Sequence, residues 1–167
     1  MAGTPIGDTV RYIPPGTREF LFCPTIANIN SPTRAELEAG TNLTAQVADW
    51  SGWSLPADFV SVPDMGSRVV AQIPGTITLS DATLVMYSSA DSDDVRTVLP
   101  RDTSGFIVVF PEGDGPANGG TGTLMDVWPV TVASESDQGK STDPAQRTVD
   151  FAMTGVPAVN VTIPAAS

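Results

Sequence analysis

The sequence predicts a mainly β protein: a sandwich or partial barrel of strands, with one short helix on its flank. Hydrophobic and polar residues alternate along several short segments, as they do in a strand with one buried face. Turn-forming residues separate these segments, since the 167 residues include 15 glycines and 15 prolines. Only one segment has the pattern of a helix. At this length we expect a single domain over residues 1–167.

The chain is expected to begin with an extended arm followed by a strand. Residues 1–16 are rich in Pro and Gly, and the run PPG at 14–16 marks the end of this arm. Residues 19–26, EFLFCPTI, are a short apolar stretch that predicts the first strand. Cys23 within it is expected to be a buried, unreactive thiol, because the sequence offers no base to activate it.

One helix is predicted, over about residues 32–39. Ser31 is able to cap it, and Pro32 occupies the favoured first helical position. Acidic residues lie in its early turns, and Gly40 supplies the stop at its C-terminal end. Its apolar face is too narrow to organise a helical domain, so we expect the helix to flank the sheet.

Three later segments alternate with a period of two residues: 76–80, 148–154 and 159–163. Their apolar side chains are expected to face a core. Four near-continuous apolar runs predict strands buried on both faces: 68–73, 83–87, 106–110 and 127–133. Pro129 interrupts the last run and is expected at a sheet edge or a bulge, because proline cannot donate a ladder hydrogen bond.

Three segments between these strands are expected to be loops: residues 51–66, 111–123 and 134–144. The first carries Trp53 and Phe59, and apolar side chains in a long loop usually pack on their own domain or on a neighbour. The second is dominated by glycine and lacks the G-K-[ST] ending of a phosphate-binding loop, so it predicts a flexible connection. The third is polar.

The composition excludes whole classes of enzyme. Eight basic and 19 acidic residues give a formal net charge of −11, there is no histidine, and there is one cysteine. A histidine-dependent triad, a histidine-ligated metal, an internal disulfide framework and a multi-cysteine zinc site are therefore ruled out. An acidic chain is also a poor ligand for DNA phosphates. We expect no enzymatic activity, no cofactor and no metal.

Two groups of carboxylates are the only catalytic candidates: Asp91, Asp93 and Asp94, and Glu112 with Asp114. Both groups lie in turns, where Asp and Gly are favoured for backbone reasons. Neither fits the register of a calcium-binding loop, and nothing fixes the separation that a glycosidase needs. We interpret both groups as turn residues.

No segment predicts secretion or membrane insertion. The N-terminal residues lack a basic stretch followed by an apolar one, and no apolar run approaches the roughly 18 residues that span a bilayer. We therefore expect the protein to be made and held in the cytosol, without a membrane partner.

Six segments carry a resemblance to a known family: PTRAELEAGTNLT (32–44), ADWSGWS (48–54), residues 58–87, VRTVLPRDTSGFIVVF (95–110), MDVWPVTVAS (125–134) and RTVDFAMTGVPAVNVTIPA (147–165). VDFAMTGVPAVNVTIP and DVWPVTV are the most specific of them. Taken in order, over about residues 7–165, they resemble the major tail tube protein of long, non-contractile-tailed bacteriophages.

The resemblance implies a structural virion protein of the phage tail, assembled in the cytoplasm of the host bacterium. Hexameric rings would stack into a tube, and the inner sheets of each ring would join into one continuous barrel. A tape-measure protein would lie inside the tube, tail terminator and tail tip proteins would bind it, and DNA would pass through without specific binding. Open sheet edges suit such a ring, because a neighbouring copy pairs them.

Contacts between stacked rings are expected from the segment 51–66, with the arm 1–16 and the tail 164–167 as further candidates. The residues assigned to stacking are Trp53, Leu55, Phe59, Val60, Val62, Asp64 and Met65. The polar residues assigned to the lumen are Thr76, Thr78, Ser80 and Asp150, although their strand faces equally suit the exterior. The acidic charge suits a lumen that does not hold DNA, or an outer surface that keeps the protein soluble.

Two other functions stay open on the sequence alone. One is a β-sandwich that binds a partner or decorates a capsid, which does not require long apolar loops at opposite ends. The other is a tail terminator or joining protein of related fold, which forms a single ring rather than a stack.

Overall fold

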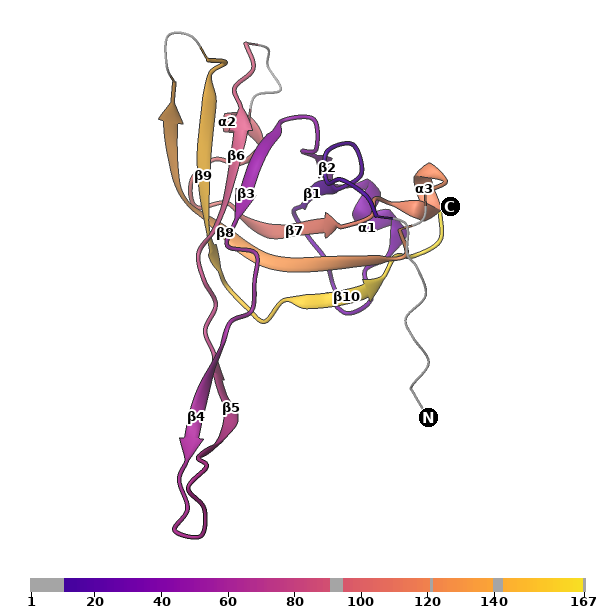
Figure 1. The fold of residues 1–167 in the computed structure, drawn as a ribbon. Helices are drawn as coiled ribbons and strands as arrows, with labels where there is room; N and C mark the ends of the chain where they lie inside the picture. The colour runs from indigo at the N-terminus through magenta and orange to yellow at the C-terminus, as the bar shows by residue number, and fades with distance from the viewer. Residues whose placement is uncertain (1–10, 91–94, 121, 140–142, 167) are drawn as a thin grey trace.

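The structure is a computed structural model, and it describes residues 11–90, 95–120, 122–139 and 143–166. Ten strands and three short helices follow one another in these residues (Figure 1). The strands are β1 (Glu19–Cys23), β2 (Thr41–Asn42), β3 (Val47–Ser51), β4 (Ala57–Val62), β5 (Ala71–Ile77), β6 (Ala82–Tyr87), β7 (Ser104–Phe110), β8 (Leu124–Gln138), β9 (Gln146–Met153) and β10 (Ala158–Thr162). The helices are α1 (Arg34–Glu38), α2 (Val95–Val98) and α3 (Gly115–Asn118).

Eight of the strands form one antiparallel sheet in the order β2-β1-β7-β8-β9-β6-β3, with β10 also paired to β8. The sheet bends over on itself, so that β7, β10 and the first half of β8 run crosswise to β9, β6 and β3 (Figure 1). The remaining two strands, β4 and β5, form a separate hairpin. The predicted mainly β class is confirmed. The described residues hold three helices rather than one, and their sheet does not close into a barrel.

Strand β7 contributes side chains to two hydrophobic cores, one on each face of the sheet. Ile107 and Val109 belong to the first core, together with residues from β1, β6, β8 and β9. Val108 and Phe110 belong to the second core, together with residues from β1, α1, β8 and β10. All four side chains are buried, which confirms the prediction of a strand buried on both faces at 106–110.

The other predicted strands differ in how they are buried. In β9, Val149 and Phe151 are fully buried, as their alternating pattern predicts. In β6, Ala82, Leu84 and Met86 are fully buried while Tyr87 is exposed, so the expectation of two buried faces was wrong. In β10 the pairing register shifts between Ala158 and Val161, where Asn160 has a φ of 57°. This irregularity turns Val159 outward, to 43% exposure.

Helix α1 begins two residues later than predicted. Its cap is Thr33, not Ser31, because Glu36 lies three residues after Thr33 and completes a capping box. The Thr33 amide donates to Glu36 Oε2 at 2.7 Å, and the Ala27 amide donates to Glu36 Oε1 at 2.8 Å. These backbone hydrogen bonds hold the pKa of Glu36 below its usual value.

The expected stop at Gly40 has a different physical basis from the one the sequence suggested. The helix ends one residue earlier, at a cap on Ala39, and Gly40 follows it. A Cβ on Gly40 would lie 2.7 Å from Cys23 Sγ and 2.9 Å from the Phe22 carbonyl oxygen. The glycine is therefore needed for close packing of the helix end against β1.

The glycine-rich segment 111–123, predicted to be a loop, contains a short helix among its described residues. This helix is α3, whose cap Asp114 accepts a hydrogen bond from the Ala117 amide at 3.4 Å. Asp114 Oδ2 also pairs with Arg34 Nη1 of α1 at 2.7 Å. A Cβ on Gly122 would collide with the Gly113 carbonyl, so two backbone segments touch here. Asp114 is a structural residue, as interpreted, whereas Asp91, Asp93 and Asp94 lie outside the described residues.

Two segments expected to be loops contain strand. Strand β4 lies within 51–66, and β8 continues through Gln138 into the segment 134–144. The polar composition of 134–138 misled the prediction, because these residues extend the sheet at a point where both of its faces approach solvent. They pair with β9, and the last pair is Gln138 opposite Gln146.

Pro129 lies inside the sheet and not at its edge. On the side away from β7, β8 pairs with β10 up to Val127 and with β9 from Val130 onward. The Pro129 carbonyl accepts a hydrogen bond from the Thr154 amide at 3.0 Å on this same side. The amide nitrogen and the carbonyl of a strand residue point to the same side of the strand. Pro129 therefore lacks its hydrogen-bond donor on the side where the partner of β8 changes from β10 to β9, and the hydrogen bonds between β8 and β7 are unaffected.

Cys23 is predicted to resist thiol reagents in the folded protein. Its side chain is fully buried, and burial, with a smaller contribution from the Glu36 charge, raises the pKa of the thiol to about 11. Only the thiolate reacts, so at pH 8 we expect no colour with Ellman's reagent in the native state and one thiol per chain in guanidinium chloride. Rapid native-state labelling would contradict this burial.

Candidate assembly interfaces

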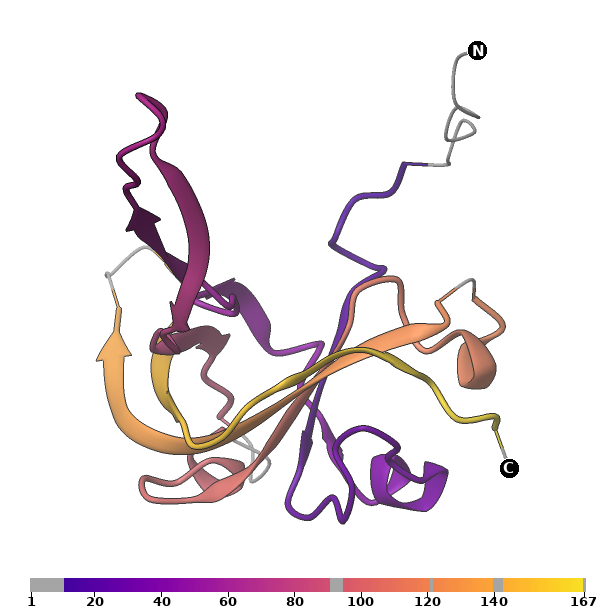
Figure 2. The ribbon, with the colours of Figure 1, turned by 90° about the horizontal axis from the view of Figure 1, so that it is seen from below.

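The β4–β5 hairpin projects away from the bent sheet and touches little of its own chain (Figures 1 and 2). Its apolar side chains are exposed, including Phe59 (67%), Val60 (50%) and Ile73 (53%). The prediction of a buried strand at 68–73 was therefore wrong, and Ile77, expected to face a core, is 56% exposed. Apolar sequence in a hairpin indicates burial, but it does not say against which molecule.

The hairpin has one aliphatic face and one mixed face. Val60 stands opposite Ile73 and Val62 opposite Ala71, and alternation places these four side chains on the same side. Between them, Ser61 stands opposite Gln72 on the other side. A two-stranded hairpin is marginal by itself in water, so a continuous exposed aliphatic face of this kind requires a cover.

The residues predicted for ring stacking divide into two groups. Trp53 and Leu55 pack against the first core of their own chain. The Trp53 ring lies edge-on to Trp128, with ring centroids 5.8 Å apart, and it is also 5.8 Å from Phe151. The other members lie on the hairpin: Phe59, Val60, Val62, Asp64 and Met65.

Two residues shape the ends of the hairpin. At its turn, Asp64 Oδ1 accepts a hydrogen bond from the Gly66 amide at 2.8 Å, and Met65 is fully exposed. At its base, Gly52 has a φ of +81°, and a Cβ there would collide with the Asp81 carbonyl. The hairpin is therefore connected to the body through Gly52 and through the half-buried Trp53 beside it.

The far half of β8, with β9, β6 and β3, forms a four-stranded sheet with two open edges. Strand β7 pairs with β8 only as far as Ser104 opposite Thr131, so residues 134–138 of β8 pair with β9 alone. On the opposite side, β3 pairs with β6 alone. Within the described residues these two edges have no further partner strand, and unpaired edges are sites where another chain adds to a sheet.

One face of this four-stranded sheet is mostly polar and carries no arginine or lysine among its described residues. Asp150 lies at its centre and accepts hydrogen bonds from Thr83 Oγ1 at 3.1 Å and Ser134 Oγ at 2.6 Å. The strand registers place further polar residues on the same face, together with three that are apolar or aromatic: Asp49, Ser51, Thr131, Ser136, Gln146 and the buried Thr148, with Val85, Tyr87 and Ala152. The opposite face packs into the first core.

The four residues predicted for the lumen do not share this face. Asp150 lies on it, whereas Thr76 lies on β5 of the hairpin. Thr78 and Ser80 lie in the link between β5 and β6. The alternating pattern at 76–80 continues beyond the end of β5 at Ile77, which explains why sequence periodicity alone joined them.

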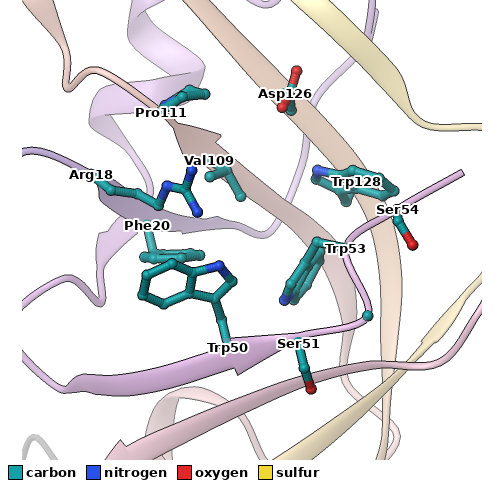
Figure 3. Close-up of a pocket in the computed structure, with 11 residues that line it drawn as sticks. Arg18, Phe20, Trp50, Ser51, Trp53, Ser54, Val109, Pro111, Asp126 and Trp128 are labelled. Atoms are coloured by element: carbon teal, nitrogen blue, oxygen red, sulfur yellow. The ribbon is translucent and has the colours of Figure 1, made fainter. Parts of the chain in front are cut away.

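An open groove that sequence reasoning did not anticipate lies beside the base of the hairpin (Figure 3). It encloses about 290 Å³, and its apolar walls include Phe20 together with Trp50, Trp53 and Trp128. Arg18 and Asp126 face it from opposite sides (Figure 3).

No catalytic or metal centre is visible in the part of the chain that the structure describes. Nowhere in those residues do three His, Cys, Asp or Glu side chains gather in a way that would hold a metal ion. The helices of the described residues are all too short to cross a membrane.

The described part of the chain is a bent antiparallel sheet with open edges and a projecting apolar hairpin, a fold without a catalytic centre among its described residues. The chain belongs to the phage tail tube protein family, whose model matches residues 7–166. Members of this family are structural components of phage tails and not enzymes. No curated protein matches the sequence.

Solved structures of tail-like machines share the fold at low sequence identity. One is the sheath/tube terminator of an extracellular contractile injection system, PVC, with a TM-score of 0.61 at 12% identity over 90% of this chain and 98% of that one. The PVC sheath-tube complex gives a TM-score of 0.58 at 12% identity, over 89% and 92% of the two chains. The tube terminating cap of the anti-feeding prophage gives 0.54 at 16% identity, over 99% and 100%.

Proposed function

We propose that the protein is the tube subunit of a long, non-contractile phage tail, assembled in the host cytoplasm as stacked hexameric rings. The observation that carries this proposal is the four-stranded sheet with one open edge on β3 and the other on residues 134–138 of β8. Two different edges on opposite sides of a sheet allow a head-to-tail contact, and such contacts form a ring when the rotation between copies closes. Pairing β3 of one copy with β8 of the next leaves no edge exposed.

In this ring the polar face around Asp150 lines the bore and the first core lies behind it. Its hydroxyls and carboxylates give DNA phosphates no arginine or lysine to pair with, so DNA passes without being held. A tape-measure protein occupies the bore before the DNA does. The exposed hairpin supplies the contact between rings, and terminator and tip proteins bind the two ends of the stack.

Negative-stain electron microscopy of concentrated protein tests this proposal. We expect uniform tubes with a central hole and sixfold end-on views. A species that stays monomeric at every concentration, alone and with tail-initiating proteins, contradicts the proposal and favours a binding or decoration module.

A single-ring terminator or joining protein is the second candidate, and the likeness to the PVC terminator and the anti-feeding prophage cap favours it. The same experiment separates the two functions. A terminator gives isolated rings that do not lengthen as the protein concentration rises, whereas a tube subunit gives stacks whose length increases with concentration.

A further inference from the structure

All three tryptophans of the chain line the same open groove (Figure 3). Phe20 joins them, with its ring centroid 5.7 Å from that of Trp50. Aromatic-lined grooves of this kind bind extended, proline-containing segments, because proline rings pack on flat aromatic faces and pay little conformational entropy.

Two charged side chains mark the sides of the groove. The Arg18 guanidinium stacks on Trp50, 4.8 Å from the ring centroid, and its Nε is buried without a hydrogen-bond partner. Across the groove, Asp126 Oδ1 accepts a hydrogen bond from the Asn160 amide at 2.8 Å (Figure 3). No arginine or lysine pairs with Asp126 among the described residues. The groove therefore suits an apolar segment that brings a positive charge to the Asp126 side.

The described part of the N-terminal arm has this composition. It reads Arg11-Tyr12-Ile13 followed by two prolines, and Ile13 is 73% exposed. The prolines disfavour a helix and keep the arm extended. Arg11 is exposed and makes no ion pair with another described residue.

The arm does not reach the groove of its own chain. The amides of Thr17 and Arg18 both donate to the Pro14 carbonyl, at 3.1 and 2.9 Å, and this turn directs the preceding residues away from the body. Figure 2 shows the arm leaving on its own, apart from the sheet. A segment with this composition, held away from a complementary groove, fits the groove of another copy.

We propose that the arm of a second copy of this chain binds in the groove, with Ile13 among the tryptophans and Arg11 beside Asp126. This inference rests on the proposed self-assembly and names one contact within it. The hairpin is the competing occupant. Its two strands are broader than one extended segment, and the groove wall at 51–54 is the hairpin's own base.

A disulfide trap in the full-length chain tests the contact. We expect the double variant I13C/S54C to form a ladder of covalent oligomers under mild oxidation, because Ser54 lines the groove and each chain then carries one donor and one acceptor. The single variants I13C and S54C are the controls, since Cys23 is buried. Cross-linking within one chain, no cross-linking in assembled protein, or a ladder only from V62C/S54C on the hairpin each overturns the proposal.

A charge exchange provides a second test of the contact. Its readout is the rate at which the covalent ladder forms in the I13C/S54C background. R11D and D126R are each expected to slow cross-linking by about tenfold, and the combination R11D/D126R restores the rate to within about threefold. Damage to the β8–β10 contact by D126R would not be rescued by R11D. Additive losses in the double variant therefore count against the pairing.

The outcomes separate this inference from the proposed function. Tubes in the electron microscope without any cross-linking at position 13 would overturn the docking of the arm and leave the tube subunit intact. Absence of rings and tubes would overturn the proposed function itself.

Discussion

Replacing Val60 and Ile73 together with aspartate is expected to abolish stacking of rings while leaving the domain folded. The two side chains stand opposite each other on the aliphatic face of the hairpin, and both are at least half exposed in the single chain. A contact that buries this face would have to desolvate two carboxylates, which costs several kcal/mol unless they are paired. Electron microscopy should show single rings or free subunits in place of tubes.

The matched control for this variant is S61D/Q72D. Ser61 and Gln72 are the next opposed pair on the same hairpin, on its other face, so the control carries the same charges at the same spacing. We expect it to retain tubes, and both double variants to keep a melting temperature within about 3 °C of the wild type. Equal loss of tubes in both would show that charge on the hairpin, and not its aliphatic face, controls stacking.

Truncating Phe151 to alanine is expected to produce the largest loss of stability among single substitutions considered for this chain. Its side chain is fully buried in the first core and contacts Trp53 at the base of the hairpin. A phenylalanine removed from a packed core costs about 3–5 kcal/mol, because the neighbours do not fill the cavity. For a chain of this size we expect a melting temperature lower by about 10 °C, measured by circular dichroism.

Phe59 is the comparison for Phe151, since the same substitution is made on an exposed ring. Phe59 is 67% exposed on the hairpin, so F59A is expected to change stability by less than about 0.5 kcal/mol. Phe59 lies on the same face as Ser61, so F59A should retain tubes, as the S61D/Q72D control does. A stability loss in F59A comparable with that of F151A would mean that the hairpin packs on its own domain in solution.

The sequence predicts the strands whose side chains fill the cores, but it misses strand segments that have no core to face. Alternation identified β9 because Val149 and Phe151 face the core, and a continuous apolar run identified β7 because both of its faces are buried. The hairpin was not recognised as a strand pair, because its apolar residues have no core to face within the chain. The far end of β8 was missed for the opposite reason, since its residues are polar on a solvated face.

The candidate sites were predictable only in part. The segment 51–66 was correctly singled out for its apolar side chains, yet Trp53 and Leu55 turn out to pack on their own core. The positive φ of Gly52 redirects the backbone just before Trp53, so that Trp53 packs on the core while the residues after Leu55 leave the domain. The aromatic groove unites residues from β1, β3 and β8, and no local pattern reports that Trp128 meets Trp50 and Trp53, which lie far from it in the sequence.

The continuity of β8 has a mechanical consequence. This 15-residue strand pairs with β7 and β10 at one end and with β9 at the other, so both halves of the bent sheet share one covalent backbone. Close packing around its buried middle, from Met125 to Val132, restricts hinging of the two halves against each other. Each subunit should therefore behave as a stiff block, and the elasticity of a filament built from it should reside in the narrow stalk of residues at the hairpin base.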